Sequence, residues 1–419
     1  MQKTYTAALI KREDSEDTRA TLVRLWRENL APPALEDDLV ERRMRWFHEE
    51  NPAGPARTWL GYHGPQREVI GSGSFYPRDV VFAGQRLKAG ILGDFAVDKA
   101  HRIAGAAMSI QREIARSAHD AGVDFLYAFP NRAAFPIFQR AGYKKIGEAS
   151  MWVKPLTAAY KLEELAAGSE DDRRRAAVAL VQRAAGRAGA AIPSQRWRAL
   201  WEGALPAWLE DRIVDVLENP ESPIVRVAVR AADAALAARD HAMILAKRKA
   251  TSDEVIGAPD LRFDELWARA RSGIIAGERS AAYLNWRYAT FKTAEYRFFC
   301  MTEPGRATLL GYVVYALQGN KVSVADLFCE DMGALFELLL LRFSERMRQE
   351  GHDAVGIVYV GAPSFAERLQ AMGFIARSFP EAVGSRWLIV YTTPSFPEAL
   401  RKEILDPERW FMPDGELDA

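Results

Sequence analysis

The order of apolar and polar positions predicts a mixture of helices and strands in the first 156 residues. Apolar side chains recur at helical spacing over 18–29 and 35–50, and apolar runs typical of strands follow over 58–62, 69–75 and 89–97. A further helix carries its apolar stripe at Ile103, Ile110 and Ile114. A short strand over 125–129 and a short helix over 133–141, which ends at Gly142, complete the series. This pattern is typical of an α/β domain with a mixed sheet.

Five short landmarks occur twice along the chain. The spacing between neighbouring landmarks in the first occurrence differs by no more than one residue from the spacing in the second. The exception is a shorter hairpin before the second aspartate. The pairs are Leu25-Trp26 and Leu266-Trp267, Trp46 and Trp286, Gly71 and Gly311, Asp94 and Asp326, and Gly142-Tyr143 and Gly373-Phe374. We interpret this agreement as an internal duplication of about 140 residues. Because a tryptophan occurs at this landmark in both copies, as Trp46 and Trp286, we expect both side chains to be core anchors.

The duplication predicts a division of the chain into four parts. Residues 1–156 and 257–400 are the two α/β copies, and 401–419 form a C-terminal tail. Residues 157–256 between the copies are rich in alanine, and we expect them to form a mostly helical connection. Within that connection the alternation of Val225, Val227 and Val229 predicts one short strand.

Composition narrows the function classes. The 419 residues include 56 basic and 56 acidic side chains, and this zero net charge argues against a nucleic-acid-binding protein. Two cysteines, Cys300 and Cys329, are too few for a disulfide framework, and the histidines and cysteines are too scattered for metal-ligand spacing, so no metal is expected. Neither a signal peptide nor an apolar run of membrane-spanning length is found. We therefore expect a cytoplasmic protein without membrane insertion, and an oligomer is compatible with the sequence.

The most informative stretch joins a strand to a helix. The apolar strand that ends at Ala96-Val97 leads through a loop to Arg102 and then to Gly105-Ala106-Ala107 at the start of the helix. The first turn of a helix exposes unpaired backbone N–H groups at the positive end of its dipole, which suits a pyrophosphate. Gly105 allows phosphates to approach the backbone closely, and Arg102 can add a charge-assisted contact.

A second motif follows the next strand and completes a family pattern. Residues Asn131, Ala134, Phe138 and Gly142-Tyr143 occur at offsets 0, 3, 7, 11 and 12. Together with the preceding loop they resemble the GNAT superfamily of acyl-CoA-dependent N-acetyltransferases. The resemblance covers 1–156 and, in a degenerate form, 257–395. It implies two tandem GNAT-type domains with acetyl-CoA, or another acyl-CoA, as co-substrate. The implied cofactor-binding residues are Phe95, Ala96, Val97, Arg102, Ile103, Ala104, Gly105, Ala106, Ala107 and Asn131.

The resemblance also directs attention to catalytic residues. Many members carry a tyrosine that protonates the departing thiolate, and here that position is Phe138. Tyr127, Tyr143 or water would have to serve instead. Asp94, one step before the residues that pair with the cofactor, is the first candidate for the general base, although a structural strand carboxylate is an equal interpretation. His48 and His101 are interpreted as surface or satisfied histidines, and Asn131 as a cap residue or a cofactor contact.

The second copy departs from the pattern where the cofactor would bind. Its loop lacks an arginine and places Glu330 and Asp331 where a pyrophosphate needs positive potential. We therefore expect one active site, in the first copy, that transfers an acyl group to a small-molecule primary amine. The element Leu284-Asn285-Trp286-Arg287-Tyr288 resembles GNAT proteins associated with bacterial polysaccharide synthesis, which implies an amino sugar as acceptor. Two alternatives are a non-catalytic protein that binds acyl-CoA or a partner, and a FemAB-like aminoacyl transferase.

Overall fold

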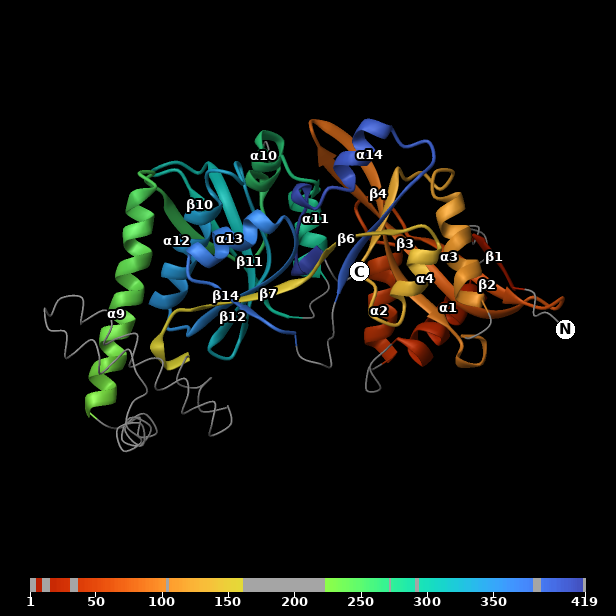
Figure 1. Cartoon of the computed structure of the whole chain (residues 1–419), viewed down its shortest axis with the longest axis horizontal. Helices are drawn as coiled ribbons and strands as arrows, with labels where there is room; N and C mark the ends of the chain where they lie inside the picture. The colour runs from red at the N-terminus through yellow and green to blue at the C-terminus, as the bar shows by residue number, and fades with distance from the viewer. Residues whose placement is uncertain are drawn as a thin grey trace, which may run out of the picture.

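The protein consists of two mixed sheets with helices packed against them. The computed structural model describes residues 5–9, 16–30, 37–102, 105–160, 223–270, 273–290, 294–379 and 386–416. Within these residues each sheet has eight strands, and Figure 1 shows the two sheets in separate halves of the molecule, with helix α9 along the outer side of the second half. The predicted α/β class is confirmed. No helix in the described ranges combines the length and the apolar character needed to cross a bilayer.

The first half contains the predicted elements in the predicted order, together with three strands that were not predicted, β1 (Tyr5–Leu9), β6 (Lys144–Glu148) and β7 (Ser150–Pro155). Its other strands are β2 (Arg57–His63), β3 (Glu68–Phe82), β4 (Gln85–Val97) and β5 (Phe125–Ala128). Its helices are α1 (Glu16–Asn29), α2 (Asp37–His48), the 3-10 helix η1 (Lys99–His101), α3 (Ala106–Ser117) and α4 (Phe135–Arg140). Pro136 lies in the first turn of α4, where its missing N–H costs no helical hydrogen bond.

The second half repeats this order after helix α9 (Pro223–Ala246). Its strands are β8 (Ser252–Ile256), β9 (Ala276–Gly277), β10 (Tyr296–Thr302), β11 (Leu309–Gln318), β12 (Lys321–Cys329), β13 (Ala354–Gly361), β14 (Ile375–Arg377), β15 (Trp387–Thr392) and β16 (Phe411–Pro413). Its helices are α10 (Leu261–Arg269), α11 (Ala281–Asn285), the π-helix η2 (Trp286–Thr290), α12 (Phe336–Gln349), α13 (Pro363–Ala371), α14 (Glu398–Ile404), and the short η3 (Pro407–Arg409) and η4 (Asp414–Glu416).

The two sheets have matching strand orders, as the repeated landmarks predict. The first runs β1-β2-β3-β4-β5-β15-β6, and the second, read in the same direction, runs β8-β10-β11-β12-β13-β7-β14. The landmark residues occupy equivalent places: Gly71 and Gly311 each pair with the last residue of the neighbouring long strand, Val97 and Cys329. The fold therefore contains the duplication that the spacing indicates.

The sixth position of each sheet is filled by a strand from the other half. Strand β7 leaves the first half and pairs with β13 and β14 of the second sheet, while β15 returns from the second half and pairs with β5 and β6 of the first. Figure 1 shows β6 and β7, in yellow, running across from one half toward the other. Neither sheet is complete within the predicted segments 1–156 and 257–400, because each exchanges one strand.

Trp46 and Trp286 lie against each other where the two halves meet. The Trp46 indole N–H donates to the Trp286 carbonyl at 2.7 Å, and the Trp286 indole N–H donates to the Trp46 carbonyl at 3.1 Å. Their ring centroids are 5.0 Å apart, and both side chains are buried. The expected core anchors thus form a reciprocal contact between equivalent positions of the two copies, which helps to join the two halves.

Three details differ from the sequence-based expectation. Val225, Val227 and Val229 lie in helix α9 and form no strand. The second sheet begins with β8, inside the segment assigned to the connection, and residues 161–222 of that segment lie outside the described ranges. The C-terminal tail is instead part of the core, since β16 pairs with β13 and the Trp410, Phe411 and Met412 side chains are fully buried.

Candidate functional site

Strands β4 and β5 pair over a short length and then separate. The parallel pairing covers Ala89 to Ile91 of β4 and Phe125 to Tyr127 of β5. Beyond Ile91, no strand in the described part of the chain pairs with residues 92–97 on the β5 side. The other edge of β5 is held by β15, which the second half supplies. The result is a fork between two strands of one sheet, in which one edge of the second part of β4 is not paired with a neighbouring strand.

A β-bulge marks the point where the fork opens. Ser72 pairs with Ala96 and Ser74 pairs with Gly93, so Asp94 and Phe95 together face the single residue Gly73. The backbone of Asp94 is in the left-handed region at φ 46°, which aspartate tolerates better than most residues. An uncommon backbone conformation persists only where surrounding contacts hold it.

Those contacts come from α2 and β3. The guanidinium of Arg43 donates to both carboxylate oxygens of Asp94, at 3.0 and 3.2 Å. His48 Nε2 lies 2.9 Å from Asp94 Oδ2, and the Tyr76 hydroxyl donates to the same oxygen. These residues form one buried polar cluster, in which the Asp94 side chain is only 8% exposed.

The charges in this cluster keep Asp94 ionised. Burial alone would raise the pKa of the Asp94 carboxyl, but the charge of Arg43 and the hydrogen bond from His48 outweigh it and hold that pKa well below its usual range. Burial also raises the pKa of the Tyr76 hydroxyl, so Tyr76 stays protonated and remains a donor. A carboxylate with such a low pKa is a weak proton acceptor. The geometry therefore favours the structural interpretation of Asp94 over its direct use as the base.

His48 is a satisfied histidine, as one of the sequence-based interpretations has it, and its partner is Asp94. It is the last residue of α2, and its imidazole is mostly buried, with 12% of the side chain exposed. With Nε2 against the Asp94 carboxylate, the hydrogen belongs on that nitrogen and the lone pair is left on Nδ1. The sequence signal is faint, because His48 and Asp94 are 46 residues apart and lie on different elements.

The loop between β4 and α3 joins the end of the fork to a helix N-terminus. Gly105 caps α3 with φ 90°, and a side chain added there would meet open space. The side chains of Ala106 and Ala107 are buried against the sheet, which brings the first turn of α3 close to it. Ile103 and Ala104 lie outside the described residues. The arrangement has the free N–H groups and the dipole that an anion requires.

Arg102 has a structural task in this loop. Its Nε donates to the Val97 carbonyl at 3.0 Å, and its Nη2 donates to Asn29 Oδ1 at 2.8 Å. The side chain thus ties the loop to the end of β4 and to the last residue of α1. Its predicted contact with a pyrophosphate remains a prediction.

Asn131 acts as a turn residue. Its side-chain oxygen accepts from the backbone N–H groups of Ala133 and Ala134, at 3.1 and 3.0 Å, just before α4. This is the cap interpretation, which the sequence already favoured. The predicted cofactor contact of Asn131 has no support from this geometry.

The two candidate tyrosines lie on opposite faces of the first sheet. Tyr127 packs with Trp410 and Phe125, whereas Tyr143 packs with Phe138 on the face covered by α3 and α4. Both hydroxyls are buried without a hydrogen-bond partner. Burial raises the pKa of both hydroxyls well above the usual value, so both stay protonated.

Only Tyr143 connects to the bulge through ring contacts. The Phe138 ring lies 5.2 Å from that of Tyr143 and 5.8 Å from that of Phe95. Phe95 is the second residue of the bulge, so this row of three rings leads from Tyr143 to the opening of the fork.

The second half also has a bulge and a fork, but its own C-terminus fills the fork. Ala325 is the extra residue of β12, and β12 pairs with β13 only as far as Ile357. Beyond that point β16 pairs with β13 on the same edge, because β7 covers the other edge. Gly415 then lies against the Ala325 carbonyl and the Tyr288 hydroxyl, so closely that a side chain would not fit.

The loop of the second half supplies its own anion. Asp331 Oδ1 accepts from the backbone N–H groups of Gly333 and Ala334, at 2.8 and 3.0 Å, just before α12. The carboxylate thus takes the place that a phosphate would need. Together with the filled fork, this agrees with the expectation of a single site in the first copy.

Asp326, the counterpart of Asp94, has different electrostatics. It pairs with Arg279 at 3.2 Å and accepts from the Tyr312 hydroxyl at 3.1 Å. Burial raises its pKa above the usual value, because Arg279 only partly opposes burial and Glu416 adds a second negative charge to the same arginine. In the described part of the chain no histidine contacts Asp326, so the histidine–aspartate pair is confined to the first half.

Comparison with known families places a domain over this site. Residues 12–146 match the family model described as "Acetyltransferase (GNAT) domain". The match lies within the first half of the chain. The matched residues include the fork, the bulge and the helix α3 loop. A comparison with curated proteins gives no significant match.

Solved structures show that the whole fold has relatives. One is a GCN5-related N-acetyltransferase from Anabaena variabilis ATCC 29413, with 12% identity, a TM-score of 0.54, and coverage of 93% of this chain and 73% of the other. A second is a conserved protein of unknown function from Enterococcus faecalis V583, described as a probable N-acyltransferase, with 9% identity, the same TM-score and the same coverage. At these identities the likeness concerns the fold, and it extends over both halves of the chain.

Proposed function

We propose that the first half transfers an acyl group from acyl-CoA to a primary amine. The observation that carries the proposal is the fork at the Asp94 bulge, which opens toward the N-terminus of α3. A fork offers an unpaired strand edge to an extended amide-containing chain such as pantetheine, and the helix N-terminus offers N–H groups to a pyrophosphate. The GNAT domain match over the same residues supports this assignment.

In this proposal the backbone does most of the cofactor binding. Phe95, Ala96 and Val97 would hydrogen-bond the pantetheine arm, and the N–H groups of residues 103–107 would hold the pyrophosphate. Arg102 would act mainly by anchoring the loop to Val97 and Asn29. A backbone N–H near the bulge would stabilise the oxyanion of the tetrahedral intermediate. Side-chain demands are then small, because positioning supplies much of the rate.

We assign the proton acceptor to His48 and a positioning role to Asp94. The ammonium form of the acceptor must lose a proton before its nitrogen can attack the thioester carbonyl. His48 can take that proton on Nδ1, while the Asp94 carboxylate fixes the orientation of the imidazole through Nε2. Arg43 and Tyr76 in turn fix Asp94.

We assign the proton donor to Tyr143. When the tetrahedral intermediate collapses, the carbon–sulfur bond breaks and the thiolate takes a proton to leave as CoA. A phenyl ring at Phe138 cannot supply it, and Tyr143 is the buried, protonated hydroxyl on the same face of the sheet. Tyr127 lies on the opposite face and is the less suitable donor.

An amino sugar is the acceptor class we propose, and its support is the Leu284–Tyr288 resemblance alone. In the structure Trp286 contacts Trp46, and Arg287 donates to the Gly415 carbonyl, so this element serves the contact between the halves. A non-catalytic acyl-CoA-binding protein is the competing function that Phe138 favours. It predicts binding of acyl-CoA without turnover of any amine. The FemAB-like alternative predicts binding of tRNA, and the zero net charge argues against it.

Binding can be tested by thermal unfolding with saturating acetyl-CoA. A ligand at a hundred times its dissociation constant stabilises the folded state by about 2.7 kcal/mol, which shifts the melting temperature by a few degrees. We expect this shift for the wild type and its loss in Gly105→Glu. The matched control is Gly122→Glu, because Gly122 has nearly the same backbone conformation (φ 89°) and also faces open space. A shift that survives in Gly105→Glu would contradict the assignment of the loop.

Turnover can be tested by following free thiol release with a panel of primary amines, amino sugars included. We expect release with at least one amine, and at least a hundredfold lower kcat for His48→Ala. Binding of acetyl-CoA with no turnover of any amine would favour the non-catalytic function.

A further inference from the structure

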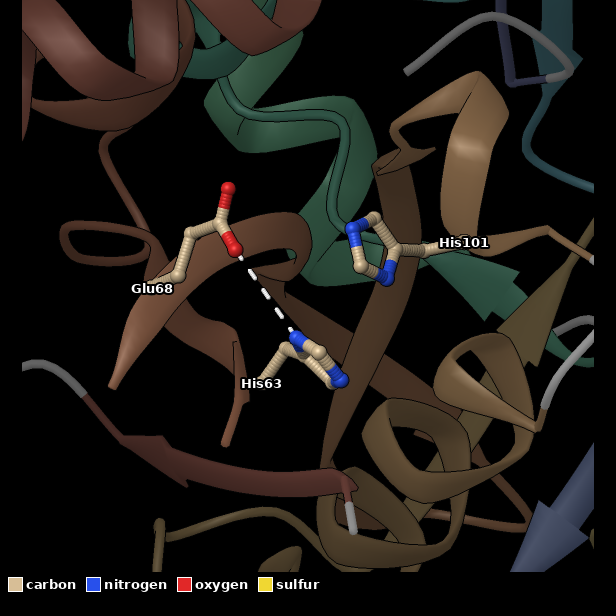
Figure 2. Close-up of side chains that lie close together, drawn as sticks. All are labelled: His63, Glu68 and His101. Carbon is tan, nitrogen blue, oxygen red and sulfur yellow. Dashed lines mark ion pairs between the residues drawn. The ribbon is translucent and has the colours of Figure 1, made fainter. Parts of the chain in front are cut away.

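Three side chains that are far apart in the sequence meet beside the cofactor loop. His63 is the last residue of β2, Glu68 is the first residue of β3, and His101 is the last residue of η1. One ligand atom from each lies within 4.8 Å of the other two, and no other such group occurs in the part of the chain that the structure describes. Figure 2 shows the two imidazole rings and the carboxylate turned toward a common point, with the ion pair between Glu68 and His63 as a dashed line.

We propose that His63, Glu68 and His101 form a binding site for a divalent transition-metal ion, with Zn²⁺ as the best fit. Two imidazoles and one carboxylate are a donor set that zinc accepts, with water as the fourth ligand. Imidazole nitrogens select against Mg²⁺ and Ca²⁺, which prefer oxygen ligands. The sequence argued against a metal because its histidines are scattered, and only the fold brings these three together.

The three ligand atoms lie within 4.8 Å of one another, so metal binding requires them to move closer together. In a tetrahedral zinc site the bonds are about 2.0–2.2 Å, so the ligand atoms lie about 3.3–3.5 Å apart. His63 Nδ1 and Glu68 Oε2 are already 3.7 Å apart, and the centroids of the two imidazole rings are 4.8 Å apart. Glu68 is the most exposed of the three, with 66% of its side chain accessible, so its carboxylate is free to move toward a metal ion.

Tyr5 of β1 orients the two imidazoles. Its hydroxyl lies 3.4 Å from His101 Nδ1, and its ring packs edge-on against His101 and tilted against His63. Outer groups of this kind hold metal-binding imidazoles in place and raise the affinity of the site. The donors therefore come from a short hairpin and a 3-10 helix, both fixed against a third strand.

The position of the site defines its role. His101 directly precedes Arg102, whose side chain ties the loop to β4 and α1. A metal ion on His101 would bind the start of this loop to the β2–β3 hairpin as well. The metal ion would thus hold the loop that leads to the N-terminus of α3.

The site is tested by titrating Zn²⁺ into the full-length, tag-free protein and measuring heat. We expect one Zn²⁺ per chain and no binding of Mg²⁺, with at least tenfold weaker zinc binding in His63→Ala and in His101→Ala. His119→Ala is the matched control, because His119 lies against Ser395 away from the site. Glu68→Gln changes an exposed side chain without endangering the fold, and we expect it to weaken zinc binding as well. Absence of zinc binding, or equal affinity in Glu68→Gln, His63→Ala and the control, would overturn the proposal.

A second measurement concerns the effect of the metal on the loop and rests on the proposed function. If acyl-CoA binds at this loop, saturating Zn²⁺ raises the affinity for acetyl-CoA, and acetyl-CoA raises the affinity for Zn²⁺ by the same factor. We expect this coupling in the wild type and its absence in Glu68→Gln. Zinc binding without any effect on acetyl-CoA would leave the site intact and refute only its link to the loop, whereas a failure of acetyl-CoA to bind would concern the proposed function alone.

Discussion

Asp94 combines an uncommon backbone conformation with a buried negative charge. Each would destabilise the fold alone, and Arg43, His48 and Tyr76 together offset both. Removing the charge leaves Arg43 buried without its partner, which typically costs about 3–5 kcal/mol. A side chain on which burial and strong charge partners act in opposite directions is common at functional sites.

The charge on Asp94 makes its contribution to stability depend on pH. Because the folded-state pKa of Asp94 is lowered, the stabilisation is fully present above its ordinary pKa of about 3.9 and is lost as the pH falls toward the folded value. We therefore expect Asp94→Asn to melt several degrees below the wild type at pH 6–7, and this gap to narrow below about pH 4. Melting curves across this range check it, with Asp38→Asn, an exposed carboxylate in the same region, as the neutral control.

Activity measurements can separate the positioning role of Asp94 from a purely structural one. In Asp94→Asn the imidazole of His48 loses the carboxylate that fixes its orientation through Nε2. We expect kcat to fall at least tenfold while the KM for acetyl-CoA stays close to the wild-type value. A variant that loses stability but keeps the wild-type kcat would show that Asp94 only supports the fold.

A substitution at Tyr143 is expected to lower activity without lowering stability. Its hydroxyl is buried without a partner, so Tyr143→Phe removes an unsatisfied group and we expect unchanged or slightly higher stability. We expect kcat to fall at least tenfold if the hydroxyl donates the proton. Tyr127→Phe removes an equally buried hydroxyl on the opposite face and should keep full activity.

The double variant Phe138→Tyr, Tyr143→Phe extends this test, because it returns a hydroxyl to the position where the GNAT pattern has one. We expect partial recovery of kcat. An equal loss in Tyr127→Phe and Tyr143→Phe would contradict the assignment of the donor.

At the scale of single residues, sequence reasoning named Asp94 and the loop, but it predicted neither the bulge nor the neighbours of Asp94. Asp94, Gly105 and Tyr143 could be named because each belongs to a local motif. The partners of Asp94 could not, since Arg43 and His48 lie 51 and 46 residues away and become neighbours only when α2 packs on the sheet. The His63, Glu68 and His101 group was invisible for the same reason.

The elements of the C-terminus show how one fork is closed while the other stays open. Strand β16 and η4 fill the second fork, and Glu416 of η4 pairs with Arg78 of β3 and with Arg279. Burial opposes the charges of Arg78 and Arg279, but their partners outweigh it and raise both pKa values. The segment formed by β16 and η4 is therefore part of the contact between the two halves as well as of the core of the second half.

A chain that ends at Trp410 should be strongly destabilised. It would lack β16 and leave Arg78 buried without its carboxylate partner, and a buried charge that loses its partner costs about 3–5 kcal/mol. We expect its melting temperature to fall by about 10 °C or more in a thermal scan. A chain that ends at Glu416 is the control and should melt like the wild type. Equal melting of the two truncated chains would contradict the role of this segment.

For the molecule as a whole, spacing predicted the duplication but not the strand exchange. The landmark residues reveal which elements repeat, because the landmarks occur in the same order along both copies. Both β7 and β15 are ordinary apolar strands, and either could have filled the place next to its own β5 or β13. The choice depends on how the connections pass between the halves, which no local pattern records.

The exchange predicts that neither half folds alone. A fragment of residues 1–160 lacks β15, whose Leu388, Ile389 and Val390 side chains are fully buried in the middle of the first sheet. We expect this fragment to show no cooperative unfolding transition, and co-expression with 161–419 to restore a complex that melts cooperatively. Circular dichroism and size-exclusion chromatography check both outcomes. A stable, cooperative 1–160 fragment would show that β15 is dispensable.

The exchange also bears on ancestry. Two copies that give one another the same strand are arranged as the subunits of a domain-swapped homodimer, in which each subunit completes its neighbour. Joining two such genes end to end would preserve the swap, and the reciprocal contact of Trp46 and Trp286 would then descend from the symmetry axis of that dimer. In the present chain one copy has an open fork, and the other holds β16 and η4 in the equivalent place.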